Sequence, residues 1–223
     1  MPFDKETAEK VRKYAGAHIA DDTWHLSFFN FINHDVLAKR LGEEFLSTRF
    51  LYKILEGLEA DAWLKRAQIR LQILSYASIY EAVLHHILFT ELVEEDSVKA
   101  LTRVQMKKEI SIPTESLAIL EKHLRHNGKN IIPTYEGLGR RKKTAIGFDE
   151  KAHCAFQFRI IDEKMRDELT AFYEYRNSIH IHAEIRKGIN YELKLSMDSY
   201  RRLQPFKEQI MSWQGTRVPT PPA

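Results

Sequence analysis

Residues 62–92 read A-W-L-K-R-A-Q-I-R-L-Q-I-L-S-Y-A-S-I-Y-E-A-V-L-H-H-I-L-F-T-E-L, and this stretch decides the fold. Its apolar residues recur at spacings of three and four, and no glycine or proline interrupts them. That spacing lines them up along one side of an α-helix. A helix of this length in a chain of 223 residues is typical of the spine of a bundle. The stripe consists of Ile69, Ile73, Ala77, Tyr80, Leu84 and Leu88.

The sequence before this stretch predicts three more helices. The first covers residues 4–20, with Asp4 as its N-cap, and the second covers 24–41 behind Thr23. The second is dense in aromatic residues, which suggests packing on both sides. The third covers 43–58 and ends near Gly57.

The sequence after it predicts a second long helix over residues 149–184, with apolar residues along one side. Residues 191–195, Y-E-L-K-L, alternate in polarity like a short strand, and a last helix follows over 199–213. Residues 127–147 contain several glycines and prolines and predict a loop. The predicted fold class is therefore all-α, a helical bundle with an irregular middle insertion.

The expected organisation is one structural domain. It comprises N-terminal helices over 1–61 and a bundle over 62–215, with an insertion around 103–148. The proline-rich tail over 216–223 is expected to be disordered.

Composition narrows the class of protein. With 43% hydrophobic residues the chain is able to build a core, which argues against wholesale disorder. A formal net charge of +3 permits a polyanionic partner without requiring one. The single cysteine, Cys154, excludes an intrachain disulfide and a four-cysteine zinc site. Without a signal peptide or a long apolar run, we expect a cytoplasmic protein that does not enter the membrane.

The stretch Y-R-N-S-I-H-I-H-A-E at 175–184 is the strongest candidate for chemistry. Arg176 falls on the apolar side of its predicted helix, where an arginine is rare unless its charge is paired or its site is wet. In a continuous helix His180 lies one turn further along that face, and His182 lies about 120° away from Arg176. Asn177 lies beside the same face.

Such a group of residues suits phosphoryl transfer on RNA. A histidine that titrates near neutral pH takes the proton from a 2′-hydroxyl or gives one to the leaving 5′-oxygen. A nearby arginine neutralises the charge that builds on the phosphate in the transition state. An asparagine orients the histidine or bonds the phosphate.

Y-R-N-S-I-H-I-H resembles the signature of the HEPN superfamily, which is an arginine, a polar residue, and a histidine after a gap of four to six residues. Arg176 to His182 leaves a gap of five, whereas Arg176 to His180 leaves three. Asn177 matches the polar residue. In this family the long upstream helix often carries a polar residue near the motif, and Glu81 matches it here. The resemblance extends from about residue 62 onward.

The resemblance implies a helical bundle that forms a homodimer, with two motifs meeting across the twofold axis. Many members are metal-independent ribonucleases in toxin–antitoxin, abortive-infection and CRISPR-linked systems, where a regulatory partner protein is common. Others have lost catalysis and serve as binding or assembly modules. The tyrosine that follows the histidine by two residues in some toxin members is absent, because Ala183 and Glu184 follow His182.

We therefore predict an endoribonuclease acting on single-stranded RNA, with a non-catalytic interaction module as the alternative. Arg176, His182, His180, Asn177 and Glu81 form its predicted site, with no cofactor and no metal. The clearest basic cluster, predicted to contact RNA, is Arg140, Arg141, Lys142 and Lys143.

Three other interpretations stay open at this point. In the first, Arg176 pairs with Glu81 or Glu174 in a purely structural role, and the histidines are interior groups whose hydrogen bonds are satisfied. In the second, His180 and His182 bind a metal, which requires a strand that turns both rings to one face. In the third, the basic cluster is a solvated loop that only aids solubility.

Overall fold

A computed structural model describes residues 2–130 and 132–217. It divides the chain into two compact units. The first unit is formed by residues 1–91 and 147–223, and the second is Leu92–Ile146, which overlaps most of the insertion expected around 103–148. The predicted tail lies outside the described residues from 218 onward.

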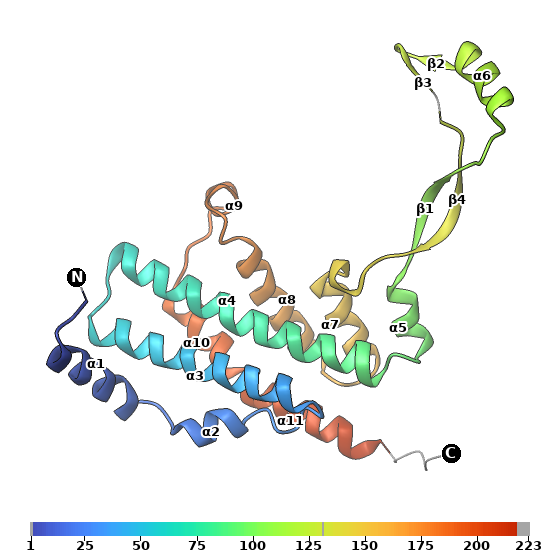
Figure 1. Ribbon diagram of the computed structural model, residues 1–223. Coiled ribbons are helices and arrows are strands. Elements are labelled where there is room, and N and C mark those ends of the chain that lie inside the picture. The colour runs from blue at the N-terminus through green and yellow to red at the C-terminus, as the bar shows by residue number, and fades with distance from the viewer. Residues whose placement is uncertain (1, 131, 218–223) are drawn as a thin grey trace. The chain divides into compact units, whose positions relative to one another are not determined.

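Among its described residues, the first unit is helical apart from its connections, which confirms the predicted helical fold class (Figure 1). Its N-terminal elements are α1 (Lys5–Ala17), α2 (Asp22–Ser27), α3 (Asp35–Gly57), α4 (Ala62–His86) and the π-helix η1 (Ile87–Glu91). Its C-terminal elements are α7 (Phe148–Gln157), α8 (Glu163–Asn177), α9 (Ile181–Lys187), α10 (Leu193–Arg201) and α11 (Leu203–Thr216).

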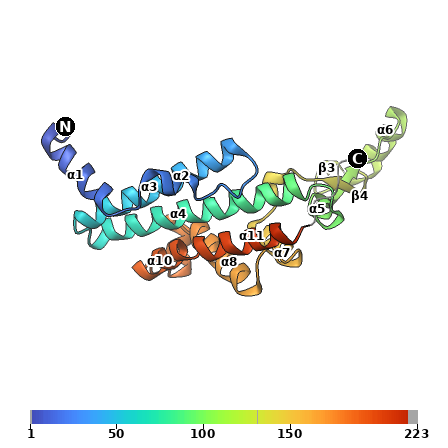
Figure 2. The ribbon, with the colours of Figure 1, turned by 90° about the horizontal axis from the view of Figure 1, so that it is seen from below.

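Helix α4 and its π-helical continuation form the predicted spine. In Figure 2, α3 lies on one side of α4, and α8, α10 and α11 lie on the other. All six residues of the predicted apolar stripe are buried, which confirms the periodicity argument. A helix covered on both sides must be apolar around most of its circumference. The further buried side chains Tyr76, Ile79 and Val83 meet that requirement.

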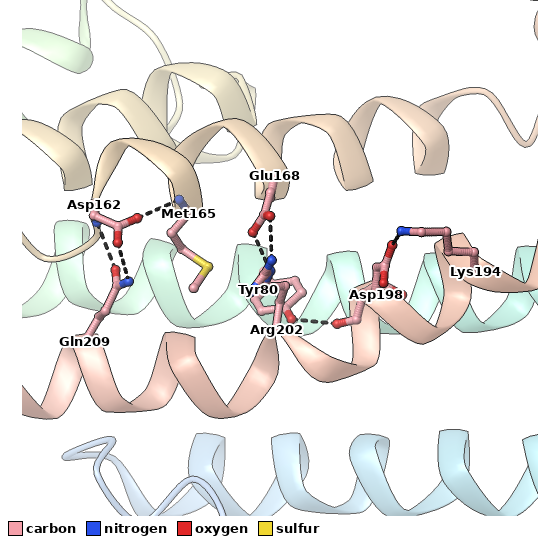
Figure 3. A network of polar contacts seen from close by, with 9 residues as sticks. Tyr80, Asp162, Met165, Glu168, Lys194, Asp198, Arg202 and Gln209 are labelled. Carbon is pink, nitrogen blue, oxygen red and sulfur yellow. Dashed lines mark hydrogen bonds and ion pairs between the residues drawn. The ribbon is translucent and has the colours of Figure 1, made fainter.

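Polar contacts tie the C-terminal helices to one another and to the spine (Figure 3). Tyr80 of α4 donates a hydrogen bond from its hydroxyl to the carbonyl oxygen of Ser199 in α10, at 2.7 Å. Arg202 pairs with Glu168 of α8. Gln209 of α11 donates to the Asp162 side chain at 2.9 Å, just before α8 begins. These contacts fix the position of α8 against α4, and therefore the position of the residues at the end of α8.

The predicted helices over 24–41 and 43–58 have the wrong boundaries. Helix α2 ends at Ser27, a turn follows that buries Phe28 and Phe29, and α3 then runs unbroken to Gly57. The His34 side chain caps α3 by accepting the Leu37 backbone N–H at 3.1 Å. Gly42 lies inside α3. A Cβ at this position would meet the Leu26 Cα of α2 at 2.8 Å, so only a glycine fits there without a shift of the backbone. The glycine therefore permits close packing of two helices instead of ending one.

The predicted helix over 149–184 is also wrong, since it is divided into α7, α8 and α9. Arg159 adopts a left-handed conformation (φ 57°) after α7, and Asp162 then caps α8 by accepting the Met165 backbone N–H at 2.7 Å. After Asn177, donors from outside the helix take the next carbonyl groups. The Tyr191 hydroxyl donates to the Ser178 carbonyl at 3.1 Å, and Arg70 donates to that of Ile179. These side chains therefore satisfy carbonyl groups at the point where α8 ends.

The strand expected at 191–195 is helical instead. Helix α10 begins at Leu193, directly after Glu192, and the last predicted helix is divided into α10 and α11. Alternation over five residues is too short a pattern to separate a strand from an amphipathic helix start. Lys194 and Asp198 also pair across one helical turn, which favours the helix.

The second unit is built around a two-stranded ribbon. Strand β1 (Arg103–Glu109) pairs antiparallel with β4 (Thr134–Arg140), from Arg103 opposite Arg140 to Glu109 opposite Thr134. Its remaining elements are α5 (Asp96–Leu101), α6 (Thr114–His123), β2 (Arg125–His126), β3 (Lys129–Asn130) and the short 3-10 helix η2 (Lys143–Ala145). Strands β2 and β3 are joined by Asn127 and Gly128, which both have positive φ, as a tight hairpin turn requires.

Candidate active site

Arg176 lies in the last turn of α8 and is half-buried. Its guanidinium carbon lies 4.9 Å from the centroid of the Tyr173 ring, one turn earlier on the same face. Its Nη1 donates to the Tyr173 hydroxyl at 3.3 Å and to the Asn177 side-chain oxygen at 3.0 Å. Two neighbours on its own helix therefore fix the direction of the arginine.

The charge of Arg176 is not compensated by a counter-ion in the part of the chain that the structure describes. Within the described part of the chain, no carboxylate lies at ion-pair distance from its guanidinium, and its Nε is buried without a hydrogen-bond partner. This differs from the structural interpretation in which Arg176 pairs with Glu81 or Glu174. A half-buried cation without a counter-ion is costly, so this position suggests an anionic ligand.

Glu81 of α4 is engaged by another cation. Its Oε1 accepts a hydrogen bond from Lys151 Nζ at 2.8 Å, and the Lys151 side chain is only 1% exposed. The pKa of Tyr173 is raised, first because its hydroxyl is partly buried and second because the carboxylate of Glu81 lies nearby. The Tyr173 ring also stacks on Phe148 of α7, with centroids 4.5 Å apart. Tyr173 thus stands between the neutralised carboxylate and the unpaired arginine.

The structure therefore brings together three of the predicted site residues, Glu81, Arg176 and Asn177, around Tyr173. The two histidines follow after the break in the helix. His180 occupies the N-cap position of α9 and His182 lies in its first turn, and both side chains are exposed. Because α8 ends at Asn177, His180 does not lie one helical turn beyond Arg176 on a continuous helix. Within the described residues of this single chain, neither imidazole is hydrogen-bonded to Arg176.

Contacts with the spine hold α9 in place. Glu184 pairs with Arg70 at 3.5 Å and with Arg66 at 3.9 Å, both from α4. At its other end α9 stops at Gly188, whose φ of 60° suits a glycine in the left-handed region. The short helix that carries the histidines is therefore anchored to the same spine as Glu81.

The metal interpretation loses its structural premise. It required a strand at 180–182, and His182 instead lies in a helix. Among the described residues, no group of three or more histidine, cysteine, aspartate or glutamate side chains is arranged to hold a metal ion. Cys154 is buried, and burial raises the pKa of its thiol to about 11, which suits an inert core residue.

The predicted basic cluster lies in the second unit, at one end of the ribbon. Arg140 is the last residue of β4, Lys142 follows as an exposed residue, and Lys143 begins η2. Arg141 has a structural role that the sequence did not reveal. Its backbone N–H donates to the Thr102 carbonyl and its Nε to the Leu101 carbonyl, each at 2.8 Å.

Two site residues escaped the sequence argument, Lys151 and Tyr173. Both carried a signal. Lys151 lies on the apolar face of α7 together with Phe148 and Ala155, at helical spacing, and a lysine there needs a partner. Tyr173 precedes Arg176 by three residues, a spacing at which helix side chains meet.

Comparison with known proteins gives no match to a protein-family model, a curated protein or a solved structure. Among the described residues, no helix is both long and apolar enough to cross a membrane.

Proposed function

We propose that this protein is a HEPN-like, metal-independent endoribonuclease that cleaves single-stranded RNA as a homodimer. The observation that supports it is Arg176. Its guanidinium is held by Tyr173 and Asn177, lacks a carboxylate partner among the described residues, and directly precedes two exposed histidines. Lys151 supports it further, because it pairs with Glu81, a carboxylate that lies near Tyr173. In this proposal the arginine is therefore available for a phosphate.

The reaction needs no group beyond these side chains. The RNA 2′-oxygen forms a bond to the adjacent phosphorus as the bond to the 5′-oxygen breaks. One histidine accepts the proton of the 2′-hydroxyl, and another delivers a proton to the leaving 5′-oxygen. Arg176 stabilises the phosphate charge in the transition state. The products are a 2′,3′-cyclic phosphate and a 5′-hydroxyl end.

A second copy completes the site in this proposal. The histidines of one chain are exposed, and facing motifs in a dimer supply the acid and the base together. Single-stranded RNA is the preferred substrate, because an unpaired nucleotide is able to bring its 2′-hydroxyl in line with the leaving group. We place the enzyme in the cytoplasm, in a defence or toxin–antitoxin setting with a regulatory partner protein.

The experiment that tests this function is RNA cleavage in excess EDTA. We expect the pure protein to cut a labelled single-stranded RNA, and the Arg176→Ala variant to leave it intact. The matched control is Arg12→Ala, which removes one exposed arginine from α1. Intact RNA with the unmodified protein would favour the alternative, an interaction module of the same fold.

We predict that His182→Ala lowers the cleavage rate more than His180→Ala. The reason is the gap of five residues between Arg176 and His182, which fits the family pattern. General acid–base catalysis commonly contributes about 10²–10⁴-fold, so the loss for His182 is expected in that range. Single-turnover rates of the two variants decide the matter, with His123→Ala of α6 as a control. A larger loss for His180→Ala would reverse the assignment.

We also predict that replacing both Arg140 and Lys142 by glutamine weakens RNA binding and flattens its salt dependence. Each lost phosphate contact lowers the slope of log K against log salt by about 0.7 for single strands. Arg141→Gln is the contrasting variant, expected to act on thermal stability, because its side chain is bonded to Leu101. Unchanged affinity and slope in the double variant would place this end of the ribbon away from RNA.

A further inference from the structure

The positive charge of the chain is concentrated in residues 103–143, here called the ribbon segment. It contains ten lysines and arginines against four aspartates and glutamates, a net charge of +6. The whole chain has 34 basic and 31 acidic residues, so the rest has 24 and 27, a net charge of −3. The two parts are therefore of opposite sign.

The ribbon segment has no core of its own. Among residues 103–129 and 132–140, no side chain is buried. Large apolar side chains are instead exposed along it, including Ile119 at 61%, Ile132 at 60% and Leu138 at 63%. A two-stranded ribbon without an apolar covering is marginally stable by itself. Apolar side chains exposed in this number on one segment favour a protein interface there.

Most of the basic groups lie near the two ends of the ribbon segment, apart from Lys107 and Lys108 within β1. At one end Arg103 lies directly opposite Arg140, a like-charge pair that is unfavourable unless an anion compensates it. At the other end, near the β2–β3 turn, Lys122, Arg125 and Lys129 are all exposed. The end at Arg140 and Lys142 remains the proposed RNA contact. At the end near the β2–β3 turn, where Ile119 and Ile132 are also exposed, the matching partner combines carboxylates with apolar side chains.

The first unit has a surface of that chemistry. A groove of about 720 Å³ is lined by aromatic and carboxylate side chains, among them Phe156, Phe158, Trp213, Asp162 and Glu163. A second groove of about 590 Å³ is lined by four carboxylates, those of Asp149, Glu150, Asp167 and Glu174.

Arg166 joins the two grooves. It lines the second groove, and its guanidinium carbon lies 4.7 Å from the Phe156 ring centroid. It also pairs with Glu163 at 3.1 Å and Asp167 at 2.7 Å. We call the combined surface the acidic face.

We propose that the ribbon segment docks on the acidic face of a second copy of this chain, in a reciprocal exchange. The opposite net charges, the exposed apolar residues and the aromatic groove make the two surfaces complementary. The exchange buries the apolar side chains that the ribbon segment exposes. Charge complementarity of this kind fixes partner choice and orientation, and it weakens as salt screens it.

The test uses two full-length charge-reversed chains. The ribbon variant carries Lys122→Glu, Arg125→Glu and Lys129→Glu, and the face variant carries Asp149→Lys, Asp167→Lys and Glu174→Lys. Sedimentation is expected to show a dimer of the 26.2 kDa wild-type chain and a monomer for each variant alone. The dimer dissociation constant should rise about 100-fold, which corresponds to about 2.8 kcal/mol. A 1:1 mixture of the two variants should dimerise again, because each ribbon segment then meets a face of opposite charge.

A third variant controls for charge alone. Lys5→Glu, Arg12→Glu and Lys13→Glu change the charge by the same amount on α1 and should leave the dimer intact. The proposal is overturned if the wild type is monomeric, if the ribbon variant still dimerises, or if the mixture stays monomeric. A ribbon variant that loses RNA affinity while it remains dimeric would make this segment an RNA-binding element. A monomeric wild type would contradict both proposals, because the proposed function also requires a dimer. A ribbon variant that still dimerises, or a mixture that stays monomeric, would contradict only the docking of the ribbon segment and would leave the dependence of RNA cleavage on Arg176 unchanged.

Discussion

Arg176→Ala is expected to lower the rate of RNA cleavage by about 100- to 1,000-fold while the fold is retained. Removing one preorganised donor that stabilises transition-state charge commonly costs about 2.7–4 kcal/mol. The fold should survive, because the hydrogen bonds of the arginine among the described residues go to Tyr173 and Asn177 on its own helix. A stacked cation of this kind contributes about 0.5–1 kcal/mol at an exposed site.

Two measurements make the prediction specific to the site. Circular dichroism melting of Arg176→Ala should shift little, which separates lost chemistry from lost structure. Arg176→Lys keeps the charge and loses the planar fork, so it should recover only part of the rate. A rate equal to that of the wild type in Arg176→Ala would remove the arginine from the mechanism.

Glu81→Ala is expected to destabilise the first unit by about 3–5 kcal/mol. The substitution leaves the ammonium of Lys151 unpaired, and that side chain is only 1% exposed. Breaking a buried ion pair by removing one partner commonly costs this much, since the remaining charge has neither water nor a counter-ion. Urea denaturation reports the change as a lower midpoint at constant slope.

The reciprocal variants check the cause. Lys151→Met should cost less, because the Glu81 side chain is 25% exposed and is able to reach water. The double variant, with Glu81→Leu and Lys151→Met, should return close to wild-type stability, because an apolar pair of similar size replaces the ion pair. Equal losses for Glu81→Ala and Lys151→Met would mean that side-chain packing, and not an isolated charge, sets the cost.

The sequence was most informative where a single period ran for many residues. The stripe from Ile69 to Leu88 is long enough to define its face, and every member is buried. The breaks in the chain were not predictable in the same way. The end of α8 depends on donors from Arg70 and Tyr191, which are far from Asn177 in the sequence. Local patterns contain no record of such contacts.

The candidate site was likewise predictable from the sequence only in part. The motif pointed to Arg176 and Asn177, and the resemblance of the upstream helix pointed to Glu81; that these residues form a site stays a prediction. The motif did not contain Lys151, which pairs with Glu81. Gly42 illustrates the converse error, because a glycine taken as a boundary proved to be a point of close helix packing.

The most direct test of the central claim is the chemistry of the RNA ends. We would incubate the protein in EDTA with a single-stranded RNA and with the same RNA carrying 2′-deoxy residues, and identify the products by mass spectrometry. The account predicts 2′,3′-cyclic phosphate and 5′-hydroxyl ends from the RNA, and no cleavage at 2′-deoxy positions. Products with a 5′-phosphate, or cleavage at 2′-deoxy positions, would contradict it, because neither is compatible with attack by the 2′-oxygen.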